Sequence, residues 1–260
     1  MKFSIGDAAN GALAFLKREG ALVAPVALVF LALPTLAIQL LVPNAGMAAM
    51  EMGKADPRIL WMLPVALFGV AGGVAITALV LKPGISVGEA LALAARRMPV
   101  VIGAWAVLVL GLSLVALGLL ILISFVGLMA GASSQSLTGL GVGVTMGLFL
   151  VAMSRLLLLI PVVVDGAAGP VAAIRRTWAL TAGRFWSLLG VILLLTLGAG
   201  LISMAAGQAI GATALLLDRL TGATPVFGAI GATILATIGA AISAFLYVLV
   251  SGIYRQLAGR

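Results

Sequence analysis

The sequence predicts an all-α integral membrane protein with six transmembrane helices in three hairpins, each preceded by a cytoplasmic amphipathic helix. Hydrophobic residues make up 63% of the 260 positions and charged residues only 8%, whereas soluble domains have roughly 45–50% and 25%. Apolar runs of at least ~18 residues recur along the chain with few or no charges, which is the pattern of membrane-spanning helices. The whole chain is therefore expected to form a single membrane domain, residues 1–260.

Six spans are expected, and short connections join them in pairs. They cover residues 21–42, 59–81, 99–130, 140–164, 185–217 and 226–250. The first run is too long for the apolar part of a signal peptide, so it is expected to be a retained span. The third and fifth runs exceed the ~20 residues that a bilayer core requires, so they must tilt, kink or extend beyond it.

A more polar stretch precedes each hairpin, and the three stretches resemble one another at an offset of 82 residues. They are Ser4-Ile5-Gly6-Asp7-Ala8, Ser86-Val87-Gly88-Glu89-Ala90 and Ala168-Gly169-Pro170-Val171-Ala172. This predicts a threefold internal repeat with units of about 1–82, 83–165 and 166–260. The alternative is chance similarity in an Ala-rich chain.

These stretches also predict where three helices begin. Ser-x-x-Asp and Ser-x-x-Glu are capping boxes, in which a hydroxyl and a carboxylate satisfy free backbone N–H groups, and Gly169-Pro170 suits a helix start because Pro fits the first helical position. Short amphipathic helices along the membrane surface are therefore expected from about residues 5, 87 and 170. Each carries a basic pair, namely Lys17-Arg18, Arg96-Arg97 and Arg175-Arg176. In the third helix, Val171, Ile174, Trp178 and Phe185 are expected to form the apolar stripe.

The distribution of basic residues orients the chain. Eleven of the 15 Lys and Arg residues are expected on the side of the amphipathic helices: Lys2, Lys17, Arg18, Lys82, Arg96, Arg97, Arg175, Arg176, Arg184, Arg255 and Arg260. Only Lys54, Arg58 and Arg219 are expected across the membrane. The positive-inside rule then predicts that both termini are cytoplasmic. Eleven bases and four acids give this face a net charge of +7.

Composition also limits the chemistry. The chain has no His and no Cys, which excludes imidazole catalysis, thiol chemistry and the commonest zinc and copper ligands. No enzyme activity, metal site or cofactor is expected. The basic residues lie beside apolar spans, so anionic membrane lipids, rather than nucleic acid, are the expected partners. A membrane-protein partner is the second expectation.

Arg155 is the one charge deep inside a predicted span. If Asp165 marks the cytoplasmic end, ten helical residues place Arg155 about 15 Å inward, where Arg costs ~2.5–3.5 kcal/mol on insertion scales. Its expected partners are backbone carbonyls, Gln39 or Gln208, water, or an anion such as a lipid phosphate. One interpretation is an anion or lipid-headgroup pathway. The other is an Arg that packs helices with satisfied hydrogen bonds, or that snorkels from a shifted span.

Glycine spacing predicts close helix packing. Gly69 and Gly73, Gly207 and Gly211, and the series Gly139, Gly143 and Gly147 form G-x-x-x-G steps, which let helix backbones approach closely. Packing within the chain is expected more than a dimer face.

One part of the sequence resembles a known bacterial membrane family. The resemblance rests on Arg155, Pro161-Val162-Val163-Val164-Asp165, Gly169-Pro170, Ala173-Ile174-Arg175-Arg176-Thr177-Trp178 and Gly183-Arg184-Phe185-Trp186. It is to the family labelled glycerophosphoryl diester phosphodiesterase membrane domain, with its YciC-like relatives, and it is sharp over residues 155–190. Asp165 and Thr177 depart from the Glu and Ser of that family. The resemblance implies a six-span protein of the bacterial inner membrane, and the hydrolase of that label is a separate soluble barrel.

Two functions follow as hypotheses. The first is a non-catalytic inner-membrane protein that engages anionic lipid or a membrane partner through its basic cytoplasmic face. The candidate residues are Arg155, Arg175, Arg176, Arg96, Arg97, Lys17 and Arg18, with Asp165, Gln39 and Gln208 as polar partners. The alternative is a transporter or lipid flippase with an intramembrane site at Arg155.

Overall fold

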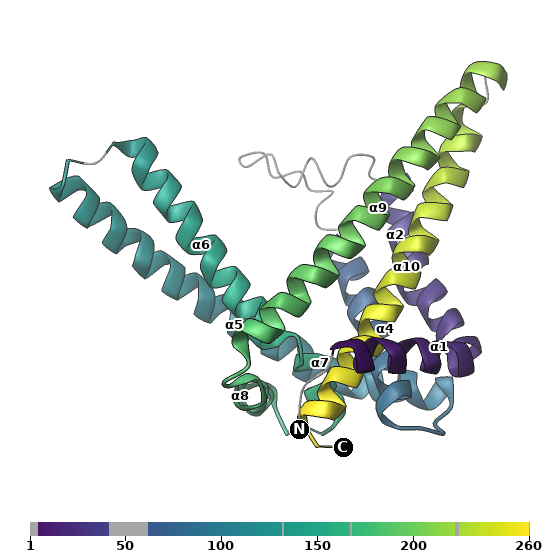
Figure 1. The fold of residues 1–260 in the computed structure, drawn as a ribbon, viewed down its shortest axis with the longest axis horizontal. Helices are drawn as coiled ribbons and strands as arrows, with labels where there is room; N and C mark the ends of the chain where they lie inside the picture. The colour runs from purple at the N-terminus through teal and green to yellow at the C-terminus, as the bar shows by residue number, and fades with distance from the viewer. Residues whose placement is uncertain (1–4, 42–61, 132, 167, 222–223, 260) are drawn as a thin grey trace. The chain divides into compact units, whose positions relative to one another are not determined.

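The computed structural model describes residues 5–41, 62–131, 133–166, 168–221 and 224–259, and all regular secondary structure within these ranges is helical (Figure 1). The helices are α1 (Ile5–Ala27), the π-helical turn η1 (Leu28–Ala32), α2 (Leu33–Leu41), α4 (Met62–Leu81), α5 (Val87–Met129), α6 (Ser134–Leu156), α7 (Leu159–Val164), α8 (Pro170–Thr181), α9 (Phe185–Thr221) and α10 (Thr224–Leu257). The predicted all-α class is confirmed.

The number of segments able to cross a membrane is also confirmed. Six are long and apolar enough within the described ranges: Gly6–Leu40, Leu63–Leu81, Val87–Met129, Ser134–Val164, Phe185–Leu217 and Val226–Leu257. The first and third of these segments include residues that were expected to form separate surface helices. In the structure these residues are continuous with the spans, because α1 follows directly into η1 and α5 is one unbroken helix. Among the described residues, only α8 forms a separate short helix before its span. Several residues used in the sequence predictions lie outside the described residues, namely Lys2, Ser4, Lys54, Arg58 and Arg260.

Proline explains the irregular turn in the first span. Pro34 has no N–H to donate to the Phe30 carbonyl, and its ring crowds that carbonyl. The backbone N–H of Leu33 instead bonds the Leu28 carbonyl, which widens the turn into the π-helix η1. The hydroxyl of Thr35, in the following turn, donates to the Leu31 carbonyl at 2.7 Å.

The capping box predicted at the start of α5 is present. The Ser86 backbone N–H donates to Glu89 Oε2 at 2.8 Å, and the Glu89 N–H donates to Ser86 Oγ at 3.2 Å. The Ser86 hydroxyl also donates to Glu89 Oε2 at 2.9 Å. At α8, Gly169 is the N-cap and Pro170 follows it as the first helical residue, without a side-chain capping bond.

Contacts divide the chain into two compact units, which we call unit 1 (residues 1–98 and 194–260) and unit 2 (residues 99–193). In unit 1, α10 packs along α1 and α4. Glycine permits this packing, because a Cβ at Gly73 would meet the Tyr247 ring, 2.7 Å from its hydroxyl oxygen. Next to it, a Cβ at Gly72 would lie 2.7 Å from the Phe30 Cβ. The predicted close approach is confirmed at Gly73.

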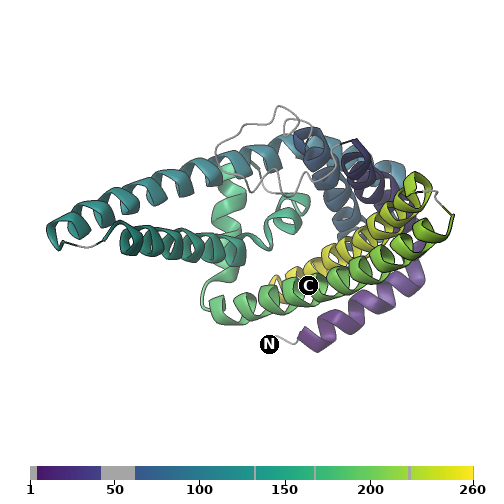
Figure 2. The same ribbon diagram turned by 90° about the horizontal axis from the view of Figure 1, so that it is seen from above.

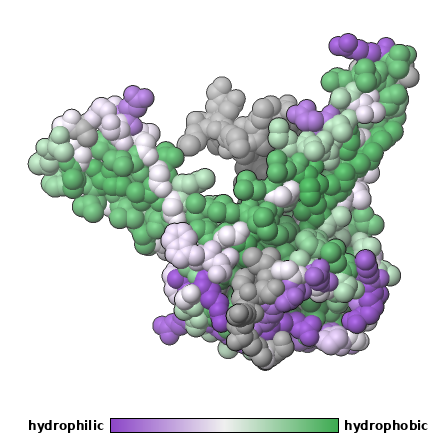
Figure 3. Space-filling view, in the orientation of Figure 1, coloured by the Kyte–Doolittle hydropathy of each residue, from purple (hydrophilic) through white to green (hydrophobic). Residues whose placement is uncertain are grey.

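In unit 2, α6 folds back antiparallel beside the part of α5 that belongs to this unit (Figures 1 and 2). Leu137 packs against Gly127, and Leu120 packs against Gly141. The outer surface of this hairpin is apolar (Figure 3) and includes Leu114, which is 67% exposed. Such a surface is expected of helices that face lipid.

The other predicted glycine contacts are not found. Gly69 on α4 has open space where a Cβ would lie, and so do Gly139, Gly143 and Gly147 on α6 and Gly207 and Gly211 on α9. The prediction that these steps pack within the chain is wrong for the described residues. Glycine is so frequent in this sequence that its four-residue spacing alone does not indicate a contact.

Candidate functional site

Arg155 lies in the last turn of α6, where the helix ends. Leu157 and Leu158 form a turn, and Leu158 has φ −92° and ψ 8°, outside the helical region. The cause is Pro161, which cannot donate to the Leu157 carbonyl and whose ring crowds it. The continuous ten-residue helix assumed between Arg155 and Asp165 is therefore wrong, and the 15 Å depth derived from it no longer follows.

The guanidinium of Arg155 contacts one hydroxyl and two aromatic rings. Nη1 donates to Thr181 Oγ1 at 3.4 Å. The central carbon of the guanidinium, Cζ, lies 5.3 Å from the centre of the Trp178 ring and 5.8 Å from that of the Phe185 ring. Both distances are within the ~6 Å range of cation–π attraction. The buried Nε has no hydrogen-bond partner among the described residues. We call Arg155, Trp178, Thr181 and Phe185 the Arg155 cluster.

Helix α8 carries two members of this cluster, Trp178 and Thr181, and Thr181 lies on its buried face. Ala173, Thr177 and Thr181 recur every fourth residue and are all buried. The two hydroxyls are buried without penalty, because Thr177 donates to the Ala173 carbonyl and Thr181 to the Thr177 carbonyl. The remaining lone pairs of Thr181 can then accept from Arg155. The sequence prediction missed this face, although Ala-x-x-x-Thr-x-x-x-Thr was its signal.

The apolar stripe predicted on α8 does not coincide with this buried face. Val171 and Trp178 are exposed and Ile174 is half-buried. The predicted stripe is therefore mainly on the outer side of the helix, whereas small residues form the side that packs on α6 and α7.

Asp165 and Arg176 form an ion pair. Arg176 Nη2 lies 2.7 Å from Asp165 Oδ2, and the two side chains are 42% and 12% exposed. Asp165 follows the last residue of α7, so this pair holds α8 to the end of α7. Because it is partly exposed, it is worth at most ~1 kcal/mol.

The neighbouring arginines are exposed. Arg175 lies on the outer side of α8, and Arg184 lies in the turn before α9. Residues 99–193 contain four Arg and one acid, Asp165, so unit 2 has a net charge of +3. We call the exposed Arg175 and Arg184, together with Arg176, the basic face of unit 2.

The other predicted site residues belong to unit 1. Lys17, Arg18 and Arg96 are exposed and Arg97 is half-buried. Gln39 and Gln208, expected as partners of Arg155, have exposed side chains in unit 1, whereas the contacts of Arg155 given above are with unit 2. Arg18 Nε lies 3.0 Å from Glu19 Oε1.

Within the described ranges no three His, Cys, Asp or Glu side chains gather where they could hold a metal ion. What this region offers is guanidinium groups, hydroxyls and aromatic rings, a set that binds anions and contacts the polar interface of a membrane.

Comparison with known proteins gives one match. The model of a family described as "Domain of unknown function (DUF7847)" matches residues 3–257. No curated protein and no solved structure matches the chain. These findings do not test the resemblance to the glycerophosphoryl diester phosphodiesterase membrane domain, which stays a prediction. Since the match covers nearly the whole chain, this protein belongs to the DUF7847 family.

Proposed function

We propose that this protein is a non-catalytic protein of the bacterial inner membrane that binds anionic lipid headgroups on its cytoplasmic side. The observation that carries the proposal is the basic face of unit 2, where Arg175 and Arg184 are exposed and Asp165 is the one acid in the sequence of this unit. Each basic residue near an anionic membrane surface contributes roughly 1 kcal/mol of attraction.

The exposed aromatic residues support the same location. Trp178 and Trp186 are both exposed, and they lie on α8 and at the start of α9 beside these arginines. Tryptophan is favoured at the membrane–water interface because its ring is apolar and its N–H is polar. Together they predict that α8 lies at the headgroup level.

The orientation is part of the proposal. In unit 1, Gly252 near the end of α10 lies close to Ala8 near the start of α1, 3.8 Å from a Cβ at Gly252 to the Ala8 carbonyl oxygen. The ends of the first and last helices are therefore neighbours, which supports termini on one side of the membrane. The positive-inside rule makes that side cytoplasmic. The threefold repeat belongs to the same proposal, with α8 and the N-terminal parts of α1 and α5 as its three surface segments.

The test removes the exposed charges and counts bound lipid. Arg175→Gln and Arg184→Gln each lower the preference of the detergent-solubilised protein for phosphatidylglycerol over phosphatidylcholine by roughly 5-fold, since ~1 kcal/mol is lost per base. Native mass spectrometry of protein with an equimolar lipid mixture gives the ratio. Arg176 is left intact because it pairs with Asp165.

Arg219→Gln is the matched control, because Arg219 is exposed in the last turn of α9, at the predicted far face. It leaves the lipid preference unchanged. An unchanged preference in the Arg175→Gln, Arg184→Gln double variant rejects the proposal, and so does an equal loss in Arg219→Gln.

The unsatisfied Nε of Arg155 favours the second candidate function, an anion-conducting or lipid-moving site. This hypothesis predicts that Arg155→Leu abolishes lipid scrambling or anion flux in proteoliposomes while the protein still folds. Flux at the wild-type rate in that variant excludes the site. The Thr181, Trp178 and Phe185 contacts support a packing role instead, so we place this function second.

A further inference from the structure

Unit 1 has an apolar groove between α1 and α10. Its volume is about 350 Å³, within the ~300–1,000 Å³ range of ligand pockets. Its lining residues are Leu16, Gly20, Val23, Ala24, Ala27, Leu28, Thr237, Ala240, Ala241 and Ala244. The groove is distinct from the Arg155 cluster and from the basic face of unit 2.

Small residues make up much of the lining of this groove. Gly20 and three alanines from α10 contribute no more than a methyl group, whereas Leu16, Val23 and Leu28 have larger apolar side chains. The one hydroxyl in the lining, that of Thr237, donates to the Thr233 carbonyl at 2.8 Å. No lining side chain therefore has an unmet hydrogen bond, and hydrocarbon is the ligand that this surface suits.

A positive charge that forms no ion pair among the described residues lies next in sequence to the groove lining. Lys17 follows Leu16 in α1 and is exposed. Arg18, the next residue, is paired with Glu19. The three charges beside the groove therefore sum to +1, and Lys17 is the one that can meet an anion.

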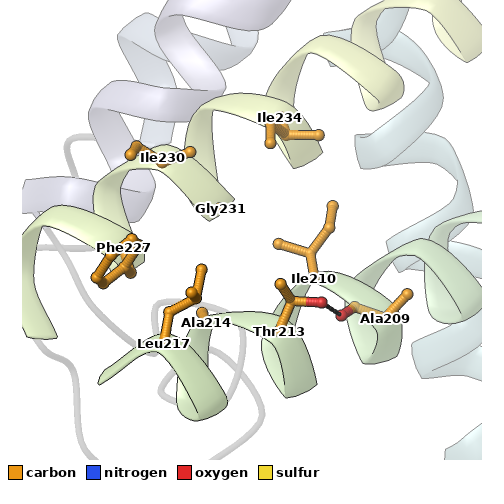
Figure 4. Close-up of a pocket in the computed structure, with 9 residues that line it drawn as sticks. All are labelled: Ala209, Ile210, Thr213, Ala214, Leu217, Phe227, Ile230, Gly231 and Ile234. Carbon is orange, nitrogen blue, oxygen red and sulfur yellow. Dashed lines mark hydrogen bonds between the residues drawn. The ribbon is translucent and has the colours of Figure 1, made fainter. Parts of the chain in front are cut away.

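A second cavity provides an internal comparison. It lies between α9 and α10, has a volume of about 210 Å³, and is also apolar (Figure 4). Phe227, Ile230 and Ile234 of α10 face α9 across it, and its lining hydroxyl, on Thr213, donates to the Ala209 carbonyl at 2.8 Å. Asp218 and Arg219, which follow the lining residue Leu217, cancel in charge.

We propose that the α1–α10 groove binds one acyl chain of an anionic phospholipid whose headgroup is held by Lys17. The proposal rests on the membrane location proposed above but on different residues, in the other unit. Charge complementarity selects the anionic lipid, since Lys17 is exposed next to the lining residue Leu16 while its charged neighbours Arg18 and Glu19 pair with each other.

Photolabelling tests this proposal. The full-length protein is reconstituted in nanodiscs with phosphatidylglycerol or phosphatidylcholine that carries a diazirine on one acyl chain, and labelled residues are mapped by mass spectrometry. Wild-type protein labels the groove at least 3-fold more with phosphatidylglycerol than with phosphatidylcholine. The α9–α10 cavity and the outer surface near Leu114 show no such preference.

Two variants separate the acyl chain from the headgroup. Ala24→Leu with Ala241→Leu, at two exposed lining positions, fills the groove and removes its label with both lipids. Ala205→Leu, an exposed position on α9 outside either cavity, is the matched control and changes nothing. Lys17→Gln keeps the label but removes the preference for phosphatidylglycerol.

Equal labelling by the two lipids in wild-type protein overturns the proposal, because the groove then holds only surrounding lipid. A groove that stays unlabelled, or a Lys17→Gln variant that keeps the preference, also overturns it. The two proposals can fail separately. If groove labelling is as expected while Arg175→Gln and Arg184→Gln leave the lipid preference unchanged, lipid binding by the basic face of unit 2 is rejected and acyl-chain binding in the groove is supported.

Discussion

The two units hold their helices together in different ways. In unit 1, glycine on α4 lets Tyr247 of α10 lie against the bare backbone at Gly73. In unit 2, the end of α6 is joined to α8 by the Arg155 cluster, a guanidinium between a hydroxyl and two rings. In a bilayer the hydrophobic effect does not draw helices together, so packing and polar contacts must do so. Unit 1 relies mainly on close packing at glycine, and unit 2 mainly on the polar and cation–π contacts of Arg155.

The largest effect is expected where a methyl group enters the packed interface of unit 1. Gly73→Ala lowers the free energy of unfolding by ~1–3 kcal/mol, because the new Cβ overlaps the Tyr247 ring. Gly69→Ala, one helical turn earlier on α4, meets open space and raises it by up to ~1 kcal/mol. Unfolding in a detergent titration, followed by circular dichroism, measures both. Equal stability of the two variants contradicts the packing described for unit 1.

The next effect concerns the Arg155 cluster. Arg155→Leu lowers the free energy of unfolding by ~0.5–2 kcal/mol through the loss of its cation–π contacts. Arg155→Lys retains only part of this free energy, because an ammonium group lacks the planar stacking surface of a guanidinium. A double-mutant cycle with Trp178→Leu isolates the coupling between the two residues. If Arg155→Leu instead raises the free energy of unfolding, the free-energy cost of desolvating the charge exceeds the stabilisation from its contacts. Unit 2 then does not depend on those contacts.

The smallest effect compares helix starts in the two units. Ser86→Ala at α5 removes the capping hydroxyl and lowers the free energy of unfolding by ~1 kcal/mol. Gly169→Ala at α8 changes it by less than ~0.5 kcal/mol. Gly169 has an extended φ of −174°, and no side-chain cap is lost. Detergent unfolding of the two variants side by side checks the contrast, and a larger loss at Gly169 contradicts it.

The capping box also has a pH signature. Glu89 lies in the first turn of α5, before the predicted span of residues 99–130. Hydrogen bonds from the Ser86 backbone N–H, and then from its hydroxyl, hold the pKa of Glu89 below its ordinary value of 4.5. The stabilising contribution of this carboxylate is therefore present above its unfolded-state pKa and is lost as the pH falls through the folded-state pKa. In Ser86→Ala this pKa moves up toward 4.5, which NMR titration of a ¹³C-labelled Glu89 side chain detects.

Much of the fold could be predicted because it depends on local properties of the sequence. Long apolar runs predicted six segments able to cross a membrane, and Ser86 with Glu89 predicted a cap that is present. The break after Leu156 could also have been predicted, since Pro161 removes the partner of the Leu157 carbonyl, just as Pro34 does for Phe30.

The surroundings of Arg155 could not be predicted in the same way. Its partners lie 23 to 30 residues further along the chain, on α8 and at the start of α9. Periodicity describes the faces of one helix and does not say which face meets another helix. The apolar stripe of α8 was recognised, but its buried Ala and Thr face was not, because those residues are only weakly apolar.

Thr181 links the Arg155 cluster to the corner between α8 and α9. Its hydroxyl accepts from Arg155, and its carbonyl accepts from the Arg184 N–H at 3.3 Å across a turn that Gly183 closes at φ +75°. A side chain at 183 would be strained in that conformation. Positions 155, 178, 181 and 183 are therefore expected to co-vary among homologous sequences. In homologues without the arginine, the threonine and the glycine are expected to be conserved less.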